Sequence, residues 1–310
     1  MENVKILNIS IDNIKQKVLL DELTKNGGIV FTPNVDHLMK LWHNPELLEI
    51  YDKADFRICD SRIVQYAACF LGTPIYEKIS GSDLFPAFYT HNRDNEDIKI
   101  FLLGGAKNIA EIARKKINLR VGREIIVDTY SPSFEFENDE GECQNILDRL
   151  LSSHANVIAV GLGAPKQEEW IVKYHNQLSS QYKIFLAIGA TIHFEAGVLK
   201  RAPRWMSQIG IEWFYRLFRE PRRLWKRYLL EDPPFFWLIF LQRLGFLSRV
   251  NKSQSLESKA VELPVNRVDS PKNKVKVGKN REKKIKSLKN EKHSKAKVNR
   301  QKVKVNTQKN

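Results

Sequence analysis

The feature that most constrains this chain is a repeated alternation of short apolar runs with longer amphipathic stretches. Most of the runs are apolar without a break, which is typical of strands covered by helices on both faces. We expect strands at Lys5–Ile9, Ile29–Thr32, Phe56–Cys59, Lys99–Leu103, Ile125–Asp128, Val157–Val160 and Ile184–Ile188. We expect helices at Asn13–Lys25, Pro45–Lys53, Ser61–Leu71, Asn108–Arg120, Cys143–Leu151 and Pro165–Gln177. The alternation predicts an α/β fold with a mainly parallel, Rossmann-like sheet.

The composition changes twice along the 310 residues. Residues 200–229 hold nine basic residues against two acidic ones, with Trp, Tyr and Phe between them. After about Asn251 the chain is rich in Lys, Asn and Ser and lacks aromatic residues, so we expect it to be disordered. The predicted organisation is an α/β core over residues 1–195, a basic helical appendage over 196–250 and a Lys-rich tail over 251–310.

Nearly all of the net charge of +15 comes from the tail and not from the core. Residues 251–310 hold 19 Lys and Arg against 5 Asp and Glu, which leaves about +1 for the rest of the chain. We therefore expect no nucleic-acid partner for the folded part. The three cysteines lack the spacing of a zinc site or a disulfide framework, which favours a cytoplasmic location.

No segment has the features of a signal peptide or a membrane-spanning helix. The first residues carry charges throughout and lack a continuous apolar run. The most apolar stretch, Phe235–Leu247, has 13 residues and contains Arg243, whereas a spanning helix needs roughly 20. Its length suits a segment that lies in the membrane interface.

Polar residues follow two of the predicted strands at the edge where α/β sheets bind ligands. Thr32 ends one strand and Asn34 follows it, and both have side chains that can hydrogen-bond a nucleotide or a sugar. Asp60 comes after the next and is placed to act as a general base on a hydroxyl group. On local pattern alone, a helix cap is the favoured role for both Asn34 and Asp60.

Two further strand ends carry weaker signals. Gly104 begins a glycine pair before a helix, where a backbone approaches a phosphate closely, although a tight turn also explains it. Gln167 opens another helix, where its amide either contacts a ligand or lies in an exposed first turn. We find no metal-binding motif and expect no metal or other cofactor. Single histidines such as His37 are more often structural than ligands.

The basic residues of the appendage form a cluster suited to a diphosphate and an anionic membrane surface. Arginine matches phosphate oxygens with two hydrogen bonds, and Trp and Tyr are favoured at the level of lipid head groups. An amphipathic helix packed on the core, with solvated charges, is the alternative. The cluster comprises Lys200, Arg201, Arg204, Arg216, Arg219, Arg222, Arg223, Lys226 and Arg227.

Over roughly residues 4–230 the chain resembles the WecG/TagA/CpsF family of bacterial glycosyltransferases. The segments that carry the resemblance are TPNVDHLMKL (32–41), LGTPIYEKISGSDLF (71–85), FLLGG (101–105), VGLGAPKQEEW (160–170) and AGVLKRAPRWMSQIGIEWFYRLFREPRRLW (196–225). The last segment is long and specific. The tail has no counterpart in the usual family pattern.

The resemblance implies an inverting, metal-independent transfer of a sugar, typically N-acetylmannosamine, from a UDP-sugar. The implied acceptor is an undecaprenyl-diphosphate-linked sugar used for teichoic acid, capsule or related polysaccharides. Asp60 matches the family's proposed base, and Thr32, Asn34 and Gln167 match donor-binding residues. The arginines Arg201, Arg204, Arg216, Arg222 and Arg223 match the acceptor-binding and membrane-contacting appendage, which implies a peripheral protein at the inner face of the plasma membrane.

Three positions depart from the usual family pattern and bear on the donor sugar. Lys78 stands where arginine is common, His193 where aspartate is common, and Ser61-Arg62 where glycine is common. We expect Lys78 and His193 to contact the donor. Transfer of glucose or another hexose is one alternative, and a non-catalytic membrane- or RNA-binding role of the Lys-rich tail is another.

Overall fold

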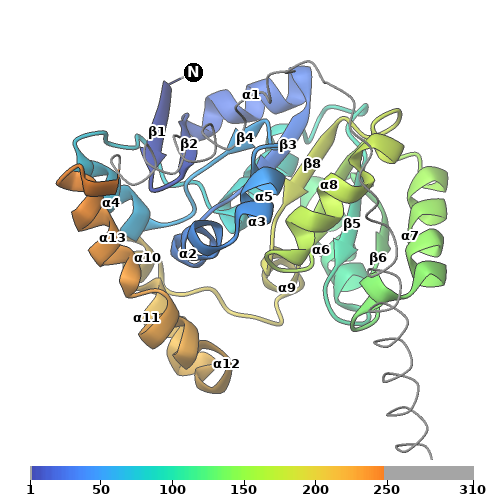
Figure 1. Ribbon diagram of the computed structural model, residues 1–310. Helices are drawn as coiled ribbons and strands as arrows, with labels where there is room; N and C mark the ends of the chain where they lie inside the picture. Colours follow the sequence, from blue (N-terminus) through green and yellow to red (C-terminus); the bar gives the residue numbers. More distant parts are fainter. Residues whose placement is uncertain (1, 248–310) are drawn as a thin grey trace, which may run out of the picture. The chain divides into compact units, whose positions relative to one another are not determined.

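The computed structural model describes residues 2–247, and a six-stranded parallel sheet forms their centre (Figure 1). The strands lie in the order β4-β3-β8-β7-β5-β6, and every neighbouring pair is parallel. Their bounds are Gly28–Phe31 (β3), Phe56–Arg57 (β4), Ile100–Gly104 (β5), Ile126–Tyr130 (β6), Val157–Gly161 (β7) and Ile184–Ala187 (β8). Six of the seven predicted strands and the Rossmann-like α/β fold are confirmed.

Helices cover both faces of the sheet, as the unbroken apolar runs predict. Along β5, Ile100 and Leu102 point into one hydrophobic core, which includes side chains of α1, α5, α6 and α9. Phe101 and Leu103 point into a second core, with side chains of α2, α3, α4, α7 and α8. The bounds are Gln16–Asn26 (α1), Val35–His43 (α2), Pro45–Tyr51 (α3), Arg62–Leu71 (α4), Gly81–His91 (α5), Ile109–Val121 (α6), Glu140–Ser152 (α7), Lys166–Leu178 (α8) and Thr191–Ala196 (α9), with a 3-10 turn at Phe136–Asn138.

The predicted strand at Lys5–Ile9 is wrong. The chain forms a hairpin there, with β1 at Glu2–Ile6 and β2 at Ile9–Asn13 paired antiparallel in a separate two-stranded sheet. Leu7 in the turn has a φ of 54°, a conformation that an apolar run does not signal. The buried side chains of Val4, Ile6, Ile9 and Ile11 belong to the same core as α2 and α4.

Asn34 acts as a helix cap in the structure, whereas Asp60 does not. The Asn34 side chain caps α2 by accepting a hydrogen bond from the His37 backbone at 3.3 Å. At the next helix the cap is Ser61, whose hydroxyl accepts from the Val64 backbone at 3.4 Å. Asp60 is therefore not needed as a cap, and its carboxylate is left for another role.

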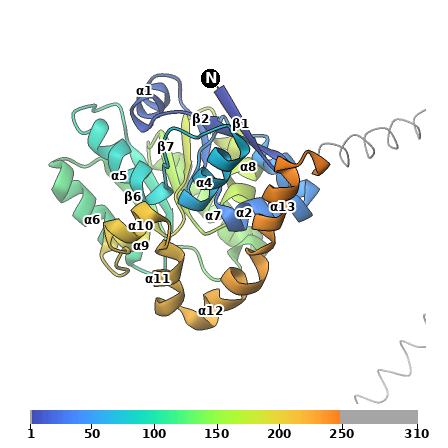
Figure 2. The same ribbon diagram turned by 90° about the vertical axis from the view of Figure 1, so that its left-hand side faces the viewer.

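The chain continues after α9 as a series of short helices, which we refer to as the appendage. It contains α10 (Arg204–Ile209), α11 (Glu212–Arg219), α12 (Pro221–Lys226), a π-helical turn (Arg227–Glu231) and α13 (Pro234–Arg243). In Figures 1 and 2 it runs to α12 and turns back, so that α13 lies beside α4 and α2. The predicted tail over 251–310 lies outside the described residues.

Helix α13 has two different faces. Phe235 and Ile239 are buried in the core shared with α2 and α4, and the Gln242 side chain accepts from the backbone of Leu7 at 2.8 Å. Phe236 and Trp237 are exposed by 60% and 61%. The predicted interfacial segment is therefore anchored to the core on one side and solvent-exposed on the other. None of the helices within residues 2–247 has the length and apolar character that crossing a membrane requires.

Candidate active site

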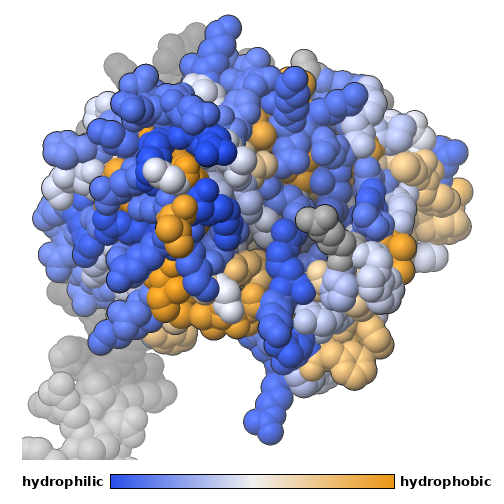
Figure 3. All heavy atoms as spheres, turned by 180° about the vertical axis from the view of Figure 1, so that it is seen from behind, coloured by the Kyte–Doolittle hydropathy of each residue, from blue (hydrophilic) through white to orange (hydrophobic). Residues whose placement is uncertain are grey.

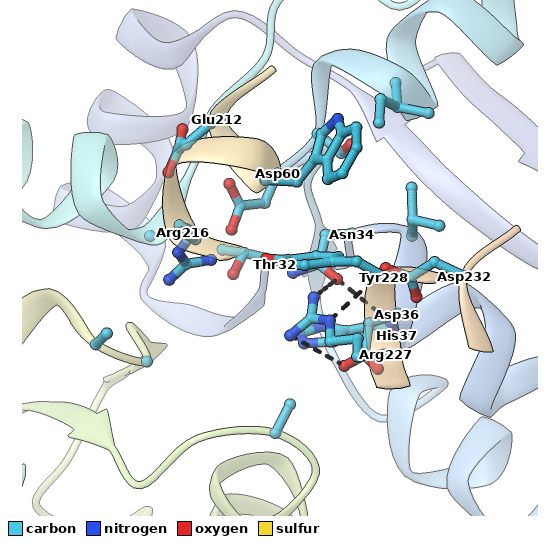
Figure 4. A pocket seen from close by; sticks show the side chains of 18 of the residues that line it. Thr32, Asn34, Asp36, His37, Asp60, Glu212, Arg216, Arg227, Tyr228 and Asp232 are labelled. Atoms are coloured by element: carbon cyan, nitrogen blue, oxygen red, sulfur yellow. Dashed lines mark hydrogen bonds and ion pairs between the residues drawn. The ribbon is translucent and has the colours of Figure 1, made fainter. Parts of the chain in front are cut away.

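A cavity of about 720 Å³ lies between the carboxyl ends of the parallel strands and the helical appendage. Residues that follow β3, β4, β7 and β8 form one wall, as expected for a ligand site in an open α/β sheet. Residues of α11, α12, the π-helical turn and α13 form the other wall. Figure 4 shows Asp60 and Arg216 on one side of this cavity and Asp36, His37 and Arg227 on the other.

Asp60 is brought into the cavity by the segment that leaves β4. Its backbone N–H donates to the Pro33 carbonyl at 3.0 Å, which joins it to the end of β3. No residue in the described range 2–247 forms a hydrogen bond with its carboxylate, so both oxygens are available to a substrate. The structure therefore presents an accessible carboxylate at the predicted position of the base.

The surroundings of Asp60 favour proton uptake near neutral pH. Burial raises the pKa of Asp60 to about 7, Glu212 and Asp83 add to the rise, and the cations Lys78 and Arg216 oppose it. A general base is most effective when its pKa lies near the working pH. The pair Asp60 and Lys78 thus combines a proton acceptor with a positive charge in one cavity.

Lys78 is held at the cavity wall by the start of α5. Its ammonium group lies 3.3 Å from a carboxylate oxygen of Asp83, and Asp83 also accepts hydrogen bonds from Ser80 at 2.6 Å and from Arg201 at 2.7 Å. These partners hold the pKa of Asp83 below its usual value against the effect of burial. Arg201 therefore pairs with the core, and it lines neither this cavity nor the neighbouring one.

Thr32 and Asn34 lie in the cavity wall beyond β3, as predicted. Thr32 is 4% exposed. The Asn34 side-chain oxygen caps α2 and also accepts a hydrogen bond from Arg227 at 3.3 Å. Asn34 therefore both caps α2 and lines the cavity.

Gln167 also lines the cavity, but its amide already has partners. Its Nε2 donates to Glu168 at 2.9 Å, and its Oε1 accepts from the Gly189 backbone at 3.0 Å. An amide nitrogen carries two hydrogens, so one N–H remains to contact a ligand. Gln167 is 2% exposed, which rules out the alternative of an exposed first turn.

A second cavity of about 480 Å³ adjoins the first beyond β7 and β8. Arg216 and Arg223 line both cavities, and His193, Lys200 and Arg219 line the second. The Nδ1 atom of His193 is buried and has no hydrogen-bond partner within residues 2–247. Burial lowers the pKa of His193, with Glu220 opposing the effect.

Gly104 has a packing role in the structure. It ends β5 with a φ of 124°, and a Cβ atom there would lie 2.4 Å from the carbonyl oxygen of Gly161 on β7. It lines neither of the two cavities. Arg222 is exposed and lines neither cavity, and the side chain of Arg204 lies outside the described part of the chain.

The structure places Arg227 in the wall of the active-site cavity. From the sequence, Arg227 was predicted only as one member of the basic cluster of the appendage. Its guanidinium lies 3.6 Å from Asp36 and 3.7 Å from Asp232, and it stacks at 5.2 Å from the ring centroid of Tyr228. A π-helical turn carries Arg227 and Tyr228, a feature often found at functional sites. Asp36 and Arg227 are far apart in the sequence, so no local sequence pattern indicates this contact.

The fold and the cavity define an α/β protein with a candidate ligand site at the carboxyl edge of its parallel sheet. The family model described as "Glycosyl transferase WecG/TagA/CpsF family" matches residues 4–249. The chain belongs to this family and is a hexosyltransferase.

Curated relatives with this match are enzymes of Staphylococcus aureus named N-acetylglucosaminyldiphosphoundecaprenol N-acetyl-beta-D-mannosaminyltransferase. The protein of strain MRSA252 is 27% identical over 235 residues, which cover 72% of this chain and 86% of the relative. The protein of strain MW2 is 26% identical with the same coverage.

Proposed function

We propose that this enzyme transfers N-acetylmannosamine from UDP-N-acetylmannosamine to an undecaprenyl-diphosphate-linked N-acetylglucosamine. The names of the relatives support the sugar and the acceptor. The observation that carries the proposal is the accessible carboxylate of Asp60, with its pKa raised to about 7, in a cavity that also holds Lys78 and Arg216. The product would serve the synthesis of a cell-surface polysaccharide or teichoic acid.

The proposed reaction is a single displacement that inverts the anomeric carbon. Asp60 accepts the proton of the acceptor's sugar hydroxyl while the hydroxyl oxygen bonds to the anomeric carbon of the donor. The bond between that carbon and the diphosphate oxygen breaks, and UDP leaves. Lys78, Arg216 and Arg223 line the cavity and would stabilise the charge that develops on the diphosphate.

We assign the donor to the wall formed by the ends of the strands. Thr32, Asn34 and Gln167 line that wall, and the remaining N–H of Gln167 is a donor for an oxygen of the nucleotide or sugar. His193 lines the adjoining cavity with an unpaired ring nitrogen, which makes it a candidate selector of the donor. A contact between Gly104 and phosphate remains a prediction from the sequence.

We place the lipid-linked acceptor on the side of the appendage and propose that the enzyme works at the inner face of the plasma membrane. Figure 3 shows hydrophobic side chains exposed on its right-hand side, where the C-terminal helices lie. Arginines of the same appendage suit an anionic surface and a diphosphate, and Arg201, Arg204 and Arg222 remain predicted contacts of this kind. The exposed apolar residues of the appendage include Trp205, Ile209, Phe214, Phe218, Trp225, Leu229, Leu230, Phe236, Trp237 and Phe240.

A radiolabel transfer assay tests the proposal. The purified chain is mixed with a panel of labelled UDP-sugars and a short-chain lipid-diphosphate N-acetylglucosamine, in the presence of EDTA. We expect label from UDP-N-acetylmannosamine in the lipid product. Label from a different UDP-hexose alone would overturn the donor and direct attention to His193 and Lys78. Absence of transfer from every donor, together with absence of UDP binding by calorimetry, would overturn the proposed function.

A further inference from the structure

A buried network of polar side chains lies behind the active-site cavity and connects two residues of its wall. The Tyr51 hydroxyl lies 2.9 Å from Nδ1 of His37, and it also interacts with the carboxyl group of Glu168. Glu168 accepts from the amide of Gln167. His37 and Gln167 line the cavity, whereas Tyr51 and Glu168 are 1% and 0% exposed. The described mechanism uses neither Tyr51 nor Glu168.

One ring nitrogen of His37 contacts this network, and the other is available to a ligand in the cavity. Nδ1 contacts Tyr51, and Nε2 has no hydrogen-bond partner within residues 2–247. Figure 4 shows His37 next to Asp36 and Arg227. Burial lowers the pKa of His37 to about 3, and Arg227 and Lys40 lower it further against the effect of Asp36. The ring is therefore neutral at physiological pH, with a single proton on one nitrogen or the other.

Within the network of Gln167, Glu168, Tyr51 and His37, Glu168 is the residue whose charge changes near neutral pH. Burial raises the pKa of Glu168 to about 7, while the contacts with Gln167, Tyr51 and Lys40 oppose the rise. Its Oε1 accepts from Gln167, and its Oε2 has no partner in hydrogen-bonding geometry among the described residues. Oε2 is thus free to donate to Tyr51 when protonated and to accept from Tyr51 when ionised.

The other charged groups beside this network are Lys40, Asp36, Arg227 and Asp232. Burial raises the pKa of Asp232 to about 6, and Arg227 opposes the rise. Lys40 and Asp36 lie on α2 and form an ion pair at 2.9 Å, and Arg227 of the π-helical turn pairs with Asp36. Lys40 and Arg227 hold the pKa of Asp36 below its usual value against the effect of burial. Burial also raises the pKa of Tyr51 far above its usual value, which leaves Glu168 as the titrating member of the network.

We propose that His37 is a further substrate-contacting residue, and that the protonation state of the buried Glu168, passed on by Tyr51, selects which nitrogen of the His37 ring carries its proton. With Glu168 protonated, its carboxyl O–H donates to Tyr51, Tyr51 donates to Nδ1 of His37, and Nε2–H faces the cavity. On ionisation the carboxyl proton passes to the Tyr51 oxygen and the former Tyr51 proton passes to Nδ1. The Nε2 proton leaves to the solvent in the cavity, so one proton is released in total.

The selected tautomer matters for a ligand that carries phosphate oxygens, and this consequence depends on the proposed function. A phosphate oxygen accepts hydrogen bonds, so it pairs with Nε2–H and is repelled by the lone pair of the other tautomer. Glu168 and Tyr51 are positioning residues in this account, because they act on the substrate only through His37. Donor binding should therefore weaken as Glu168 ionises.

Nuclear magnetic resonance on the full chain tests the tautomer directly. Two-bond proton–nitrogen correlations of the ¹⁵N-labelled imidazole rings are recorded at pH 6 and pH 8.5, and the His37 signals are assigned with His37→Gln. We expect His37 to change from the Nε2–H to the Nδ1–H tautomer in the wild-type protein. Glu168→Gln keeps the side-chain size and should show no change with pH. The control Glu169→Gln alters the exposed neighbour on the same helix and should behave like the wild type.

A single His37 tautomer across this pH range in the wild-type protein would overturn the inference, as would a switch that persists in Glu168→Gln. Should Glu168→Gln not fold, Tyr51→Phe removes the hydroxyl that links Glu168 to His37, and it must also abolish the change of the His37 tautomer with pH.

Steady-state kinetics provide a second readout that a purely structural role would not move. We expect the KM for the UDP-sugar to rise about tenfold between pH 6 and pH 8.5 in the wild type and to stay constant in Glu168→Gln. A parallel rise in both proteins would overturn the link to Glu168. If the wild type neither transfers sugar nor binds UDP, the proposed function fails, whereas the ring tautomer still decides this inference.

Discussion

At the scale of single residues, Asp60 carries the strongest expectation. Because the base must be ionised to accept a proton, and burial raises the pKa of Asp60 to about 7, kcat should rise with pH and level off above that value. Each pH unit below it should lower kcat about tenfold. Lys78 opposes the rise of this pKa, so Lys78→Gln should move the acid limb of the profile to higher pH. An unmoved limb would contradict this, and Lys17→Gln on the exposed part of α1 is the control.

Glu168 makes a second prediction, on stability. Its pKa is raised in the folded state, so its contribution to stability is complete below the pKa of the unfolded chain and is lost as pH rises through about 7. Between pH 5 and pH 8 this loss is about 2 kcal/mol. Urea unfolding at both pH values should show a correspondingly smaller loss in Glu168→Gln. An identical loss in the wild type and the variant would contradict the raised pKa.

The residues of the site differ in how far the sequence reveals them. The place of Asp60 in the cavity was predictable because it follows a strand at the ligand-binding edge. The local pattern favoured a helix cap, and the structure gives that role to Ser61. The contact of Tyr51 with His37 and Glu168 was not predictable, because α3 and α8 meet only in the folded protein. His37 in isolation favours a structural role, and only its place in the cavity wall indicates otherwise.

At the scale of elements, Arg227 connects the appendage to the core. Its guanidinium lies between Asp36 and Asp232. Replacing it with alanine removes the cation beside Asp232 and leaves Asp36 with Lys40 alone. Hydrogen exchange in the π-helical turn and α13 should become faster by roughly a hundredfold, which corresponds to about 3 kcal/mol. Arg222→Ala, at an exposed position of α12, is the matched control. Equal exchange in both variants would show that Arg227 does not hold the appendage.

Secondary structure was predictable where the hydrophobic pattern is long and regular, and less so elsewhere. The buried strands of the parallel sheet appear as unbroken apolar runs, and α6, α7 and α8 lie close to their predicted positions. The helices α5 and α9 were not predicted, and α2 was expected only as the helix that follows Asn34, without bounds. Helix α5 contains Pro86 and begins at Gly81, which obscures its pattern. The hairpin at the start was misread because its turn at Leu7 is apolar.

At the scale of the whole molecule, the exposed apolar surface of the appendage should bind membranes. The double variant Phe236→Ser with Trp237→Ser removes two side chains that are 60% and 61% exposed. We expect binding to vesicles of phosphatidylglycerol and phosphatidylcholine to fall by at least about tenfold in a sedimentation assay. Leu119→Ser, at an 86% exposed position on α6, should have no effect. Equal loss in both variants would contradict a specific membrane surface.

The proposed reaction requires Asp60 to act as the base in the cavity between the core and the appendage. The most direct measurement compares wild type and Asp60→Asn in transfer from labelled UDP-N-acetylmannosamine to the lipid-diphosphate acceptor, with UDP affinity measured by calorimetry on both proteins. We expect Asp60→Asn to lose at least about a thousandfold in kcat and to bind UDP with an affinity close to that of the wild type. Transfer at the wild-type rate by Asp60→Asn would show that Asp60 is not the base.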